Sequence, residues 1–209
     1  TATVLTPSFT ASNKTYDGNT SATVPTRTLS GVLAGDTVNL TGGTATFANA
    51  NAGTGKTVNI AGLSLSGPDA YKYTLSSTTA STTATIAKAN ATVSVSGYTG
   101  VYNAAAHGAT GTVVGVGSDL TAVGSSLNVG ASFTDAPGGT ASWTFTGGTN
   151  YNNQSGTAAI VIAKADATVS VSGYTGVYNA AAHGATGTVV GVGSDLTAVG
   201  SSLNVGASF

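Results

Sequence analysis

The chain has 209 residues, of which 41% are hydrophobic and only 6% are charged, and its formal net charge is −1. Nucleic-acid binding needs clustered cations, and the six Lys and Arg residues form no cluster, so nucleic acid is not an expected partner. The absence of Cys excludes disulfides and thiolate metal sites, and no apolar run approaches the roughly 20 residues of a membrane span, so no membrane insertion is expected.

Thr, Ser and Asn supply the polar surface, and the abundant Thr and Val favour strands over helices. The hydrophobic content is too high for a disordered chain, so packed cores are expected. The composition therefore predicts an all-β protein. In the first 88 residues, strand-like runs lie at Thr3 to Leu5, Val38 to Leu40, Thr44 to Phe47, Thr57 to Ile60, Tyr71 to Leu75 and Thr82 to Ile86.

A tight turn is predicted within the stretch KTYDGNTSATV, where Asp17 precedes Gly18. Gly accepts a positive φ, and the Asp carboxylate can bond the backbone two residues on. The matching places later in the chain have Ala104 and Ala180 instead of Gly. Because Ala disfavours a positive φ, we expect either a different turn type or Asn103 in the left-handed position.

From residue 89 the chain repeats itself. Residues 89–164 form one unit, and residues 165–209 copy its beginning with a period of 76 residues and a single difference, Asn90 against Asp166. A period this long exceeds that of solenoid and propeller units, so each unit can be a small domain. The second copy lacks a counterpart of residues 134–164, and we expect it to be loosely packed with an unpaired edge and exposed apolar surface.

Within the repeat, apolar residues recur at spacing two. The alternating pairs are Val93 and Val95, Trp143 and Phe145, and Ile160 and Ile162. Such alternation buries one face of a strand, and several short strands separated by Gly-rich turns predict a sandwich of two antiparallel sheets. Trp143, Phe145 and Ala141 on one strand face are interpreted as core, with a sugar-stacking platform as the alternative.

The connections between units lack Gly, Pro and charge-rich linkers. Between Ile86 and Val93 the last strand of one unit is expected to run nearly straight into the first strand of the next. Short connections restrict interdomain motion, so a fairly stiff array of three modules is expected: residues 1–88, 89–164 and the shortened 165–209. Because the chain opens at Thr1 and stops within a repeat, we also expect it to be a piece of a longer protein.

No catalytic, cofactor or metal residue is assigned from the sequence. The two histidines, His107 and His183, lack a neighbouring acid and nucleophile, since the next acidic residue after His107 is Asp119, twelve positions on. They are interpreted as structural residues at a strand or turn edge. An intramolecular Lys–Asn crosslink would need a buried acid, and no Asp is expected to be buried.

Two further patterns are only weak evidence, one for calcium binding and one for glycosylation. GVGSDL, residues 115–120, resembles a calcium turn of β-rolls, but it occurs once per repeat, and the junctions offer only Asn90 and Asp166 as ligands. Five Asn-x-Ser/Thr sequons are expected by chance in a chain of this composition: Asn13, Asn19, Asn39, Asn90 and Asn153.

Two stretches carry a family resemblance. KTYDGNTSATV, LSGVLAGDTVNL and YTLSSTTASTTATIAK in residues 1–88 closely resemble the bacterial YDG repeat domain. GYTGVYNAAAHGATG and NVGASFTDAPGGTASWTFTGGTNYN, in the unit at 89–164, are similar to the MBG-type bacterial immunoglobulin-like domain. The resemblance implies tandem immunoglobulin-like sandwiches of a secreted or surface-attached bacterial protein, as in filamentous-haemagglutinin-like adhesins.

The function that the resemblance implies is non-catalytic. We expect a stalk segment of an extracellular or cell-surface adhesin, which extends or multivalently presents a binding surface. Its partner would be a host-cell, matrix or glycan ligand, bound in part through regions outside this chain. The alternative is an accessory or carbohydrate-binding region of a secreted enzyme.

Overall fold

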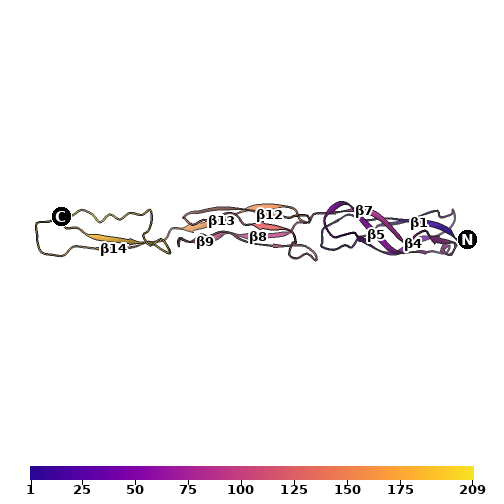
Figure 1. The fold of residues 1–209 in the computed structure, drawn as a ribbon, viewed down its shortest axis with the longest axis horizontal. Coiled ribbons are helices and arrows are strands. Elements are labelled where there is room, and N and C mark those ends of the chain that lie inside the picture. Colours follow the sequence, from indigo (N-terminus) through magenta and orange to yellow (C-terminus); the bar gives the residue numbers. More distant parts are fainter. The chain divides into compact units, whose positions relative to one another are not determined.

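The computed structural model describes residues 1–209, and its regular structure is β throughout apart from one 3-10 turn, η1 (Ala70–Lys72). The all-β prediction is therefore confirmed. The chain divides into two compact units. Unit 1 comprises residues 1–93, 113–126 and 145–154, and unit 2 comprises residues 94–112, 127–144 and 155–209. Each unit thus combines parts of successive modules, and Figure 1 labels the main strands along the chain.

The first module contains two sheets. One has the strand order β3–β1–β6 and the other β2–β7–β5–β4. Their bounds are β1 (Thr3–Thr10), β2 (Lys14–Thr15), β3 (Thr26–Ser30), β4 (Asn39–Phe47), β5 (Gly53–Ser66), β6 (Tyr73–Leu75) and β7 (Thr79–Ala87). All six predicted runs overlap strands of this module, but the runs from Val38 and from Thr44 belong to the single strand β4, and the start of the run Tyr71 to Leu75 lies in η1. Strands β2 and β3 were not predicted.

The core of the first module follows from alternation along the strands. In β1, Leu5, Pro7 and Phe9 are buried while the Thr and Ser residues between them are exposed. In β5, Val58 and Ile60 are buried on the same period. Each strand thereby presents one face to the core and one to solvent.

The strand pairing differs from a purely antiparallel sandwich. β6 joins β1 in parallel, β2 joins β7 in parallel, and the second module has a parallel pair as well. The partners in these pairs lie far apart in the chain, and parallel neighbours need long crossover connections. Alternation predicts which face a strand buries, but it does not predict the neighbour across the ladder.

The second module also has two sheets. β8 (Thr92–Ser96) pairs with β10 (Thr110–Val114), and the other sheet has the order β11–β12–β13–β9. The bounds of these last strands are β9 (Tyr98–Val101), β11 (Ser126–Asn128), β12 (Gly138–Thr146) and β13 (Gln154–Ala163). Ala141, Ile160 and Ile162 are buried in its core, with Val95 and Tyr98 packed against them.

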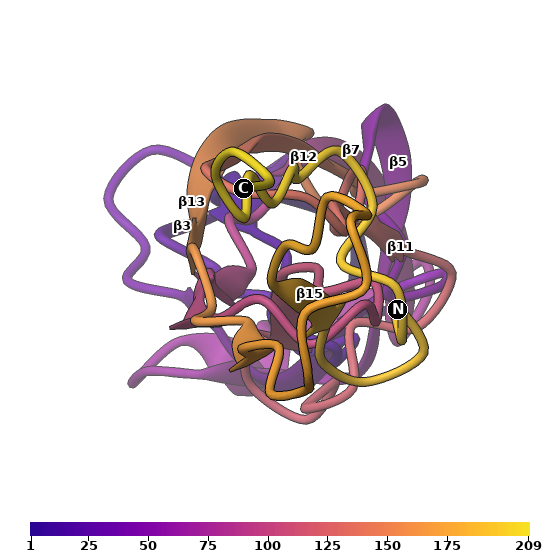
Figure 2. The same ribbon diagram turned by 90° about the vertical axis from the view of Figure 1, so that its left-hand side faces the viewer.

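The third copy keeps only one strand pair, β14 (Thr168–Ser172) with β15 (Thr186–Val190). Its remaining residues run in irregular loops, drawn in yellow around β15 in Figure 2. Val169 and Val171 are each 54% exposed and Tyr178 is 94% exposed. The expected exposure of apolar surface is confirmed, because this copy has no counterparts of β12 and β13 to cover it.

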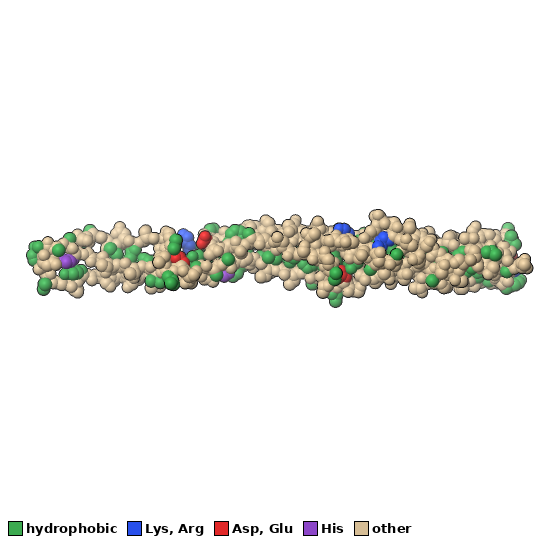
Figure 3. Space-filling model, in the orientation of Figure 1, with side chains coloured by type: hydrophobic (Ala, Val, Ile, Leu, Met, Phe, Trp, Pro, Cys, Tyr) green, Lys and Arg blue, Asp and Glu red, His purple; other side chains and the backbone are tan.

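Charged side chains are sparse and scattered over the face shown in Figure 3, in keeping with the 6% charged residues of the sequence. None of the helical structure is long and apolar enough to cross a membrane.

Candidate functional site: a loop docked on a tyrosine turn

The most elaborate polar cluster of the chain lies within unit 1, where a loop of the second module meets a turn of the first. We call residues 115–125 the docking loop and residues 16–18 the tyrosine turn. The docking loop is held by its own backbone: Gly115 N–H donates to Leu120 O over 3.0 Å, and Asp119 N–H donates to Val116 O over 2.9 Å. Asp119 Oδ1 accepts the Val123 N–H over 3.0 Å. The loop therefore has a defined shape with the Asp119 carboxylate at its centre.

The tyrosine turn is fixed to the end of the first module. Tyr16 N–H donates to Ala87 O over 2.8 Å. Asp17 Oδ1 accepts from Lys14 Nζ over 2.8 Å and from Asn19 N–H over 3.1 Å, as the Asp-Gly turn prediction anticipated. Gly18 has φ 78°. Partial burial opposes ionisation of Asp17, yet the bonds from Lys14 and Asn19 outweigh it and lower the pKa of this carboxyl.

Two tyrosine hydroxyls converge on one carboxylate. Tyr16 donates to Asp119 Oδ2 over 2.9 Å, and Tyr151 donates to the same oxygen over 2.8 Å. The two rings meet edge to face with centroids 5.4 Å apart. Tyr151 is fully buried, and Tyr16 and Asp119 are only 7% and 8% exposed. A buried carboxylate without a cation is thus satisfied by two phenols and one backbone N–H.

This environment shifts the pKa values in opposite directions. Burial opposes ionisation of Asp119, but the bonds from Val123, Tyr151 and Tyr16 outweigh it, so its pKa is lowered. Burial and the bond to Asp119 raise the pKa of Tyr16 to about 12, and the same two causes raise the pKa of Tyr151. The cluster therefore holds an ionised acid between two neutral phenols over a wide pH range.

Close backbone approach completes the docking. Ser118 N–H donates to Asp17 O over 3.1 Å. A Cβ on Gly117 would lie 2.0 Å from Asp17 O, and one on Gly18 would lie 2.5 Å from Ser118 Oγ. Both glycines have positive φ, 56° and 78°. Only glycine at these two positions lets the loop and the turn come this close.

A second segment of the second module, residues 147–154, encloses the connection between the modules, and we call it the clasp. Ala89 and Tyr151 form a parallel bridge, and Lys88 Nζ donates to Gly148 O over 2.6 Å. Asn152 Nδ2 donates to Asn90 Oδ1 over 2.8 Å. The connection at residues 88–91 is thus bonded along its length and is not a free linker, as its lack of Gly and Pro had indicated.

Unit 2 contains a second copy of this docking. The tyrosine turn is now residues 102–104, and the docking loop is residues 191–201. Tyr102 N–H donates to Ala163 O over 2.8 Å, and the Tyr102 hydroxyl lies 3.4 Å from Asp195 Oδ2. A Cβ on Gly193 would lie 1.9 Å from Asn103 O. Burial and the nearby Asp195 raise the pKa of Tyr102.

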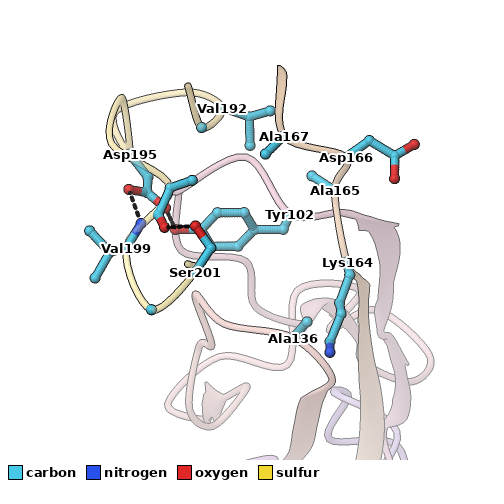
Figure 4. Close-up of a pocket in the computed structure, with 13 residues that line it drawn as sticks. Tyr102, Ala136, Lys164, Ala165, Asp166, Ala167, Val192, Asp195, Val199 and Ser201 are labelled. Atoms are coloured by element: carbon cyan, nitrogen blue, oxygen red, sulfur yellow. Dashed lines mark hydrogen bonds between the residues drawn. The ribbon is translucent and has the colours of Figure 1, made fainter. Parts of the chain in front are cut away.

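The second docking leaves a cavity of about 330 Å³ where unit 1 has its clasp. Its lining includes Tyr102, Lys164, Asp166, Asp195 and Ser201. Figure 4 shows the Tyr102 ring reaching the Asp195 carboxylate, while Asp166 extends away from them. The counterpart of Tyr151 by the 76-residue period would be position 227, which lies beyond the 209 residues of the chain.

The structure corrects two expectations. Asp119 is buried, contrary to the prediction that no Asp is, because the hydroxyls of two distant tyrosines solvate it. Ala104 and Ala180 themselves adopt positive φ, 64° and 62°, so the turn keeps its type and Asn103 does not take the left-handed position. The Asn103 Oδ1 atom accepts from Ala105 N–H over 3.0 Å and thereby holds the turn in shape.

The histidines take part in local structure. His107 stacks on Tyr98 with centroids 3.9 Å apart, and its Nε2 lies 2.9 Å from Asn103 Oδ1. Because Asn103 Oδ1 already accepts an N–H, Nε2 is the donor. His107 also exchanges two backbone bonds with Phe133 at an isolated bridge. These contacts place it at a turn edge, as interpreted from the sequence.

Of the remaining candidates, Ala141 and Phe145 are buried core residues, while Trp143 is half-buried with its ring over Gly156. The structure contains no cluster of three or more His, Cys, Asp or Glu side chains that could hold a metal ion. In the sequence, GVGSDL is only a weak calcium pattern, and no motif predicts a role for Tyr16, Tyr102 or Tyr151. The one available signal was the recurrence of Tyr before each turn.

Comparison with known proteins supports the identification of the N-terminal module. Residues 1–84 match the protein family described as the YDG domain. No curated protein matches the chain, and no solved structure matches it.

Proposed function

We propose that this chain is a non-catalytic, load-transmitting segment of a bacterial secreted or surface-attached adhesin. The observation that carries the proposal is the repeated docking of one loop type on one turn type. The docking loop at residues 115–125 sits on Tyr16, and its copy at residues 191–201 sits on Tyr102. A chain that reuses one junction for successive modules is suited to joining many of them in series.

The construction of the junction also suits a stalk. Its buried groups bond one another, and the clasp bonds the connection between modules at Lys88, Ala89 and Asn90. Pulling the modules apart would therefore expose the Asp119 carboxylate and break its buried bond from Tyr16 together with the Ser118–Asp17 backbone bond.

Within this proposal, residues 89–164 are an MBG-type immunoglobulin-like repeat and residues 165–209 the start of another. The location would be extracellular or on the cell surface, where a chain without Cys or Met resists oxidation. The ligand, of host-cell, matrix or glycan chemistry, would be bound chiefly by other parts of the same protein.

The test is replacement in the source bacterium. We expect deletion of the region encoding residues 1–209 to reduce adhesion, and replacement by unrelated sandwich domains of equal length to restore it. The isolated chain should show no binding on a glycan array. Glycan binding, combined with failure of the replacement to restore adhesion, would overturn the stalk assignment and favour a carbohydrate-binding region.

A further inference from the structure

The first module has its own version of the carboxylate–tyrosine arrangement found in the docking loop. It lies in residues 31–37, which we call the Asp36 loop, where Asp36 N–H donates to Leu33 O over 3.2 Å. The Tyr73 hydroxyl donates to Asp36 Oδ2 over 2.6 Å and accepts the Leu33 N–H over 3.1 Å. Tyr73 is buried. Three hydrogen bonds thus join Leu33, Asp36 and Tyr73 into one unit.

The docking loop has the same three bonds. Asp119 N–H donates to Val116 O over 2.9 Å, Tyr151 donates to Asp119 Oδ2 over 2.8 Å, and Val116 N–H donates to the Tyr151 hydroxyl over 3.2 Å. The acid follows its backbone partner by three positions in both loops. The two loops differ in most of their sequence, so the shared arrangement reflects a shared way of folding and is not a copied stretch of chain.

The remaining bonds of the two carboxylates show where the loops differ. Asp119 Oδ1 accepts a backbone N–H of its own loop, whereas Asp36 Oδ1 accepts from Lys72 Nζ over 2.8 Å. Asp119 Oδ2 accepts a second hydroxyl, that of Tyr16 from the preceding module. A carboxylate oxygen has two lone pairs, so Asp36 Oδ2 can also accept a second hydroxyl beside that of Tyr73.

The first strand of every module begins at the Thr of an Ala-Thr-Val sequence. These strands are β1 at Thr3, β8 at Thr92 and β14 at Thr168. Before β8 and β14 this sequence follows directly on the connection to the preceding module, at residues 88–90 and 164–166. The first module thus has both the strand start and the type of loop with which the second module meets its predecessor.

The glycine of the Asp36 loop is shifted by one position. Gly117 lies two positions before Asp119, and the Asp36 loop has Ala34 at that place, followed by Gly35. Gly35 has a φ of 94°, and a Cβ built on it would have no atom within 4 Å. An incoming turn is therefore expected to approach the Asp36 loop most closely at Gly35.

We infer that the Asp36 loop is a docking site for the tyrosine turn of a module that precedes the first module in the same polypeptide. The incoming tyrosine would donate to Asp36 Oδ2, as Tyr16 does to Asp119 Oδ2. A tyrosine turn is the favoured occupant because the three bonds that shape the receiving loop are the same in both modules. The inference concerns the order of modules and does not depend on the adhesin proposal.

The first experiment adds a module to the full chain. Residues 89–166 are placed directly before Ala2, so that Asp166 is followed by Ala-Thr-Val as it is in the repeat. We expect amide hydrogen exchange at residues 33–37 to slow about tenfold relative to the original chain, the effect of one additional buried hydrogen bond. Tyr102→Phe in the added copy should remove this gain. Tyr178→Phe, at a residue 94% exposed, is the control and should leave the gain unchanged.

A second extended chain keeps the test decisive if the first added module does not fold. It carries residues 1–90 before Ala2 and so offers the turn with Tyr16 instead. The same slowing at residues 33–37 is expected, and Tyr16→Phe in the added copy should remove it. Unchanged exchange at these residues in both extended chains would overturn the inference, as would a gain that survives both substitutions. Exchange that slows with rising concentration of the original chain would assign the loop to a second copy and would also overturn it.

Discussion

The two dockings within this chain use the same parts and differ in completeness. In unit 1, Asp119 is 8% exposed and receives two hydroxyls at 2.9 and 2.8 Å. In unit 2, Asp195 has one hydroxyl at 3.4 Å and lies beside a cavity. The loop conformation is nevertheless the same, with Val199 N–H donating to Asp195 Oδ1 over 2.9 Å as Val123 does to Asp119. The loop therefore forms its shape locally, and the clasp supplies the burial.

Among the substitutions that test the difference between the two dockings, Tyr151→Ala should lower stability the most. The substitution removes a fully buried aromatic ring and the donor to Asp119. We expect a loss of about 4 kcal/mol in the unfolding free energy of unit 1. Chemical denaturation followed by circular dichroism measures it. Tyr178→Ala, at a residue 94% exposed, is the control and should change stability little.

A comparison of Asp119→Ala with Asp195→Ala tests whether the carboxylate contributes to the free energy of unfolding only where it is buried. Removing the Asp119 carboxylate leaves the buried Tyr16 hydroxyl and the Val123 N–H without their acceptor and takes one of two acceptors from Tyr151, so we expect a loss of about 2 kcal/mol in unfolding free energy. Asp195→Ala should lower the free energy of unfolding by less than about 1 kcal/mol, because water can reach Tyr102 and Val199, the hydrogen-bond partners of Asp195. Equal losses in the two variants would contradict the role assigned to the clasp.

Gly117→Ala tests the close approach of the loop to the tyrosine turn. The new Cβ would lie 2.0 Å from Asp17 O, and residue 117 has a φ of 56°. The loop must therefore shift, and the hydrogen bond from Tyr16 to Asp119 must lengthen. A loss of about 2 kcal/mol is expected. Hydrogen exchange at Ser118 checks the mechanism, because its N–H donates to Asp17 O and should lose protection. Gly124→Ala, with open space around its Cβ but also a positive φ, provides the control for backbone strain alone.

The pH dependence sharpens the comparison further. The pKa of Asp119 is lowered on folding, so its contribution is present above the unfolded value, near 4, and is lost as the pH falls through the folded value. The pKa of Tyr16 is raised to about 12, so its contribution is present below about 10 and is lost as the pH rises toward 12. Denaturation at a series of pH values should show a plateau between these limits. Asp119→Asn should reduce the acid slope without abolishing it, because the pKa values of Asp17, Asp36 and Asp69 are lowered as well. An unchanged acid slope would contradict this assignment.

The smallest expected effect is a gain in stability. Ala104 holds φ 64° where the first module has Gly18 at 78°. Ala104→Gly should therefore relieve strain and stabilise the second module by about 1 kcal/mol. Thermal denaturation measures the shift, and Ala105→Gly, at a neighbour without positive φ, should not raise the melting temperature.

Much of the fold could be predicted from the sequence because burial in a strand follows alternation. The runs at Thr44 to Phe47 and Thr82 to Ile86 coincide with β4 and β7 for this reason. The parallel pairs could not be predicted, since alternation does not identify the neighbouring strand. The docking site was missed because Tyr16, Asp119 and Tyr151 are separated by 103 and 32 positions and meet only through the fold.

The position of the docking loop and the tyrosine turn has a consequence for assembly. The second module contributes residues 115–125 to one docking and Tyr102 to the other, so it carries two unlike surfaces. The loop of one module therefore matches the turn of the module before it, whereas two loops or two turns do not match. Since the turn with Gly18 and the turn with Ala104 accept the same loop sequence, the first and second modules offer the same kind of surface to the module that follows.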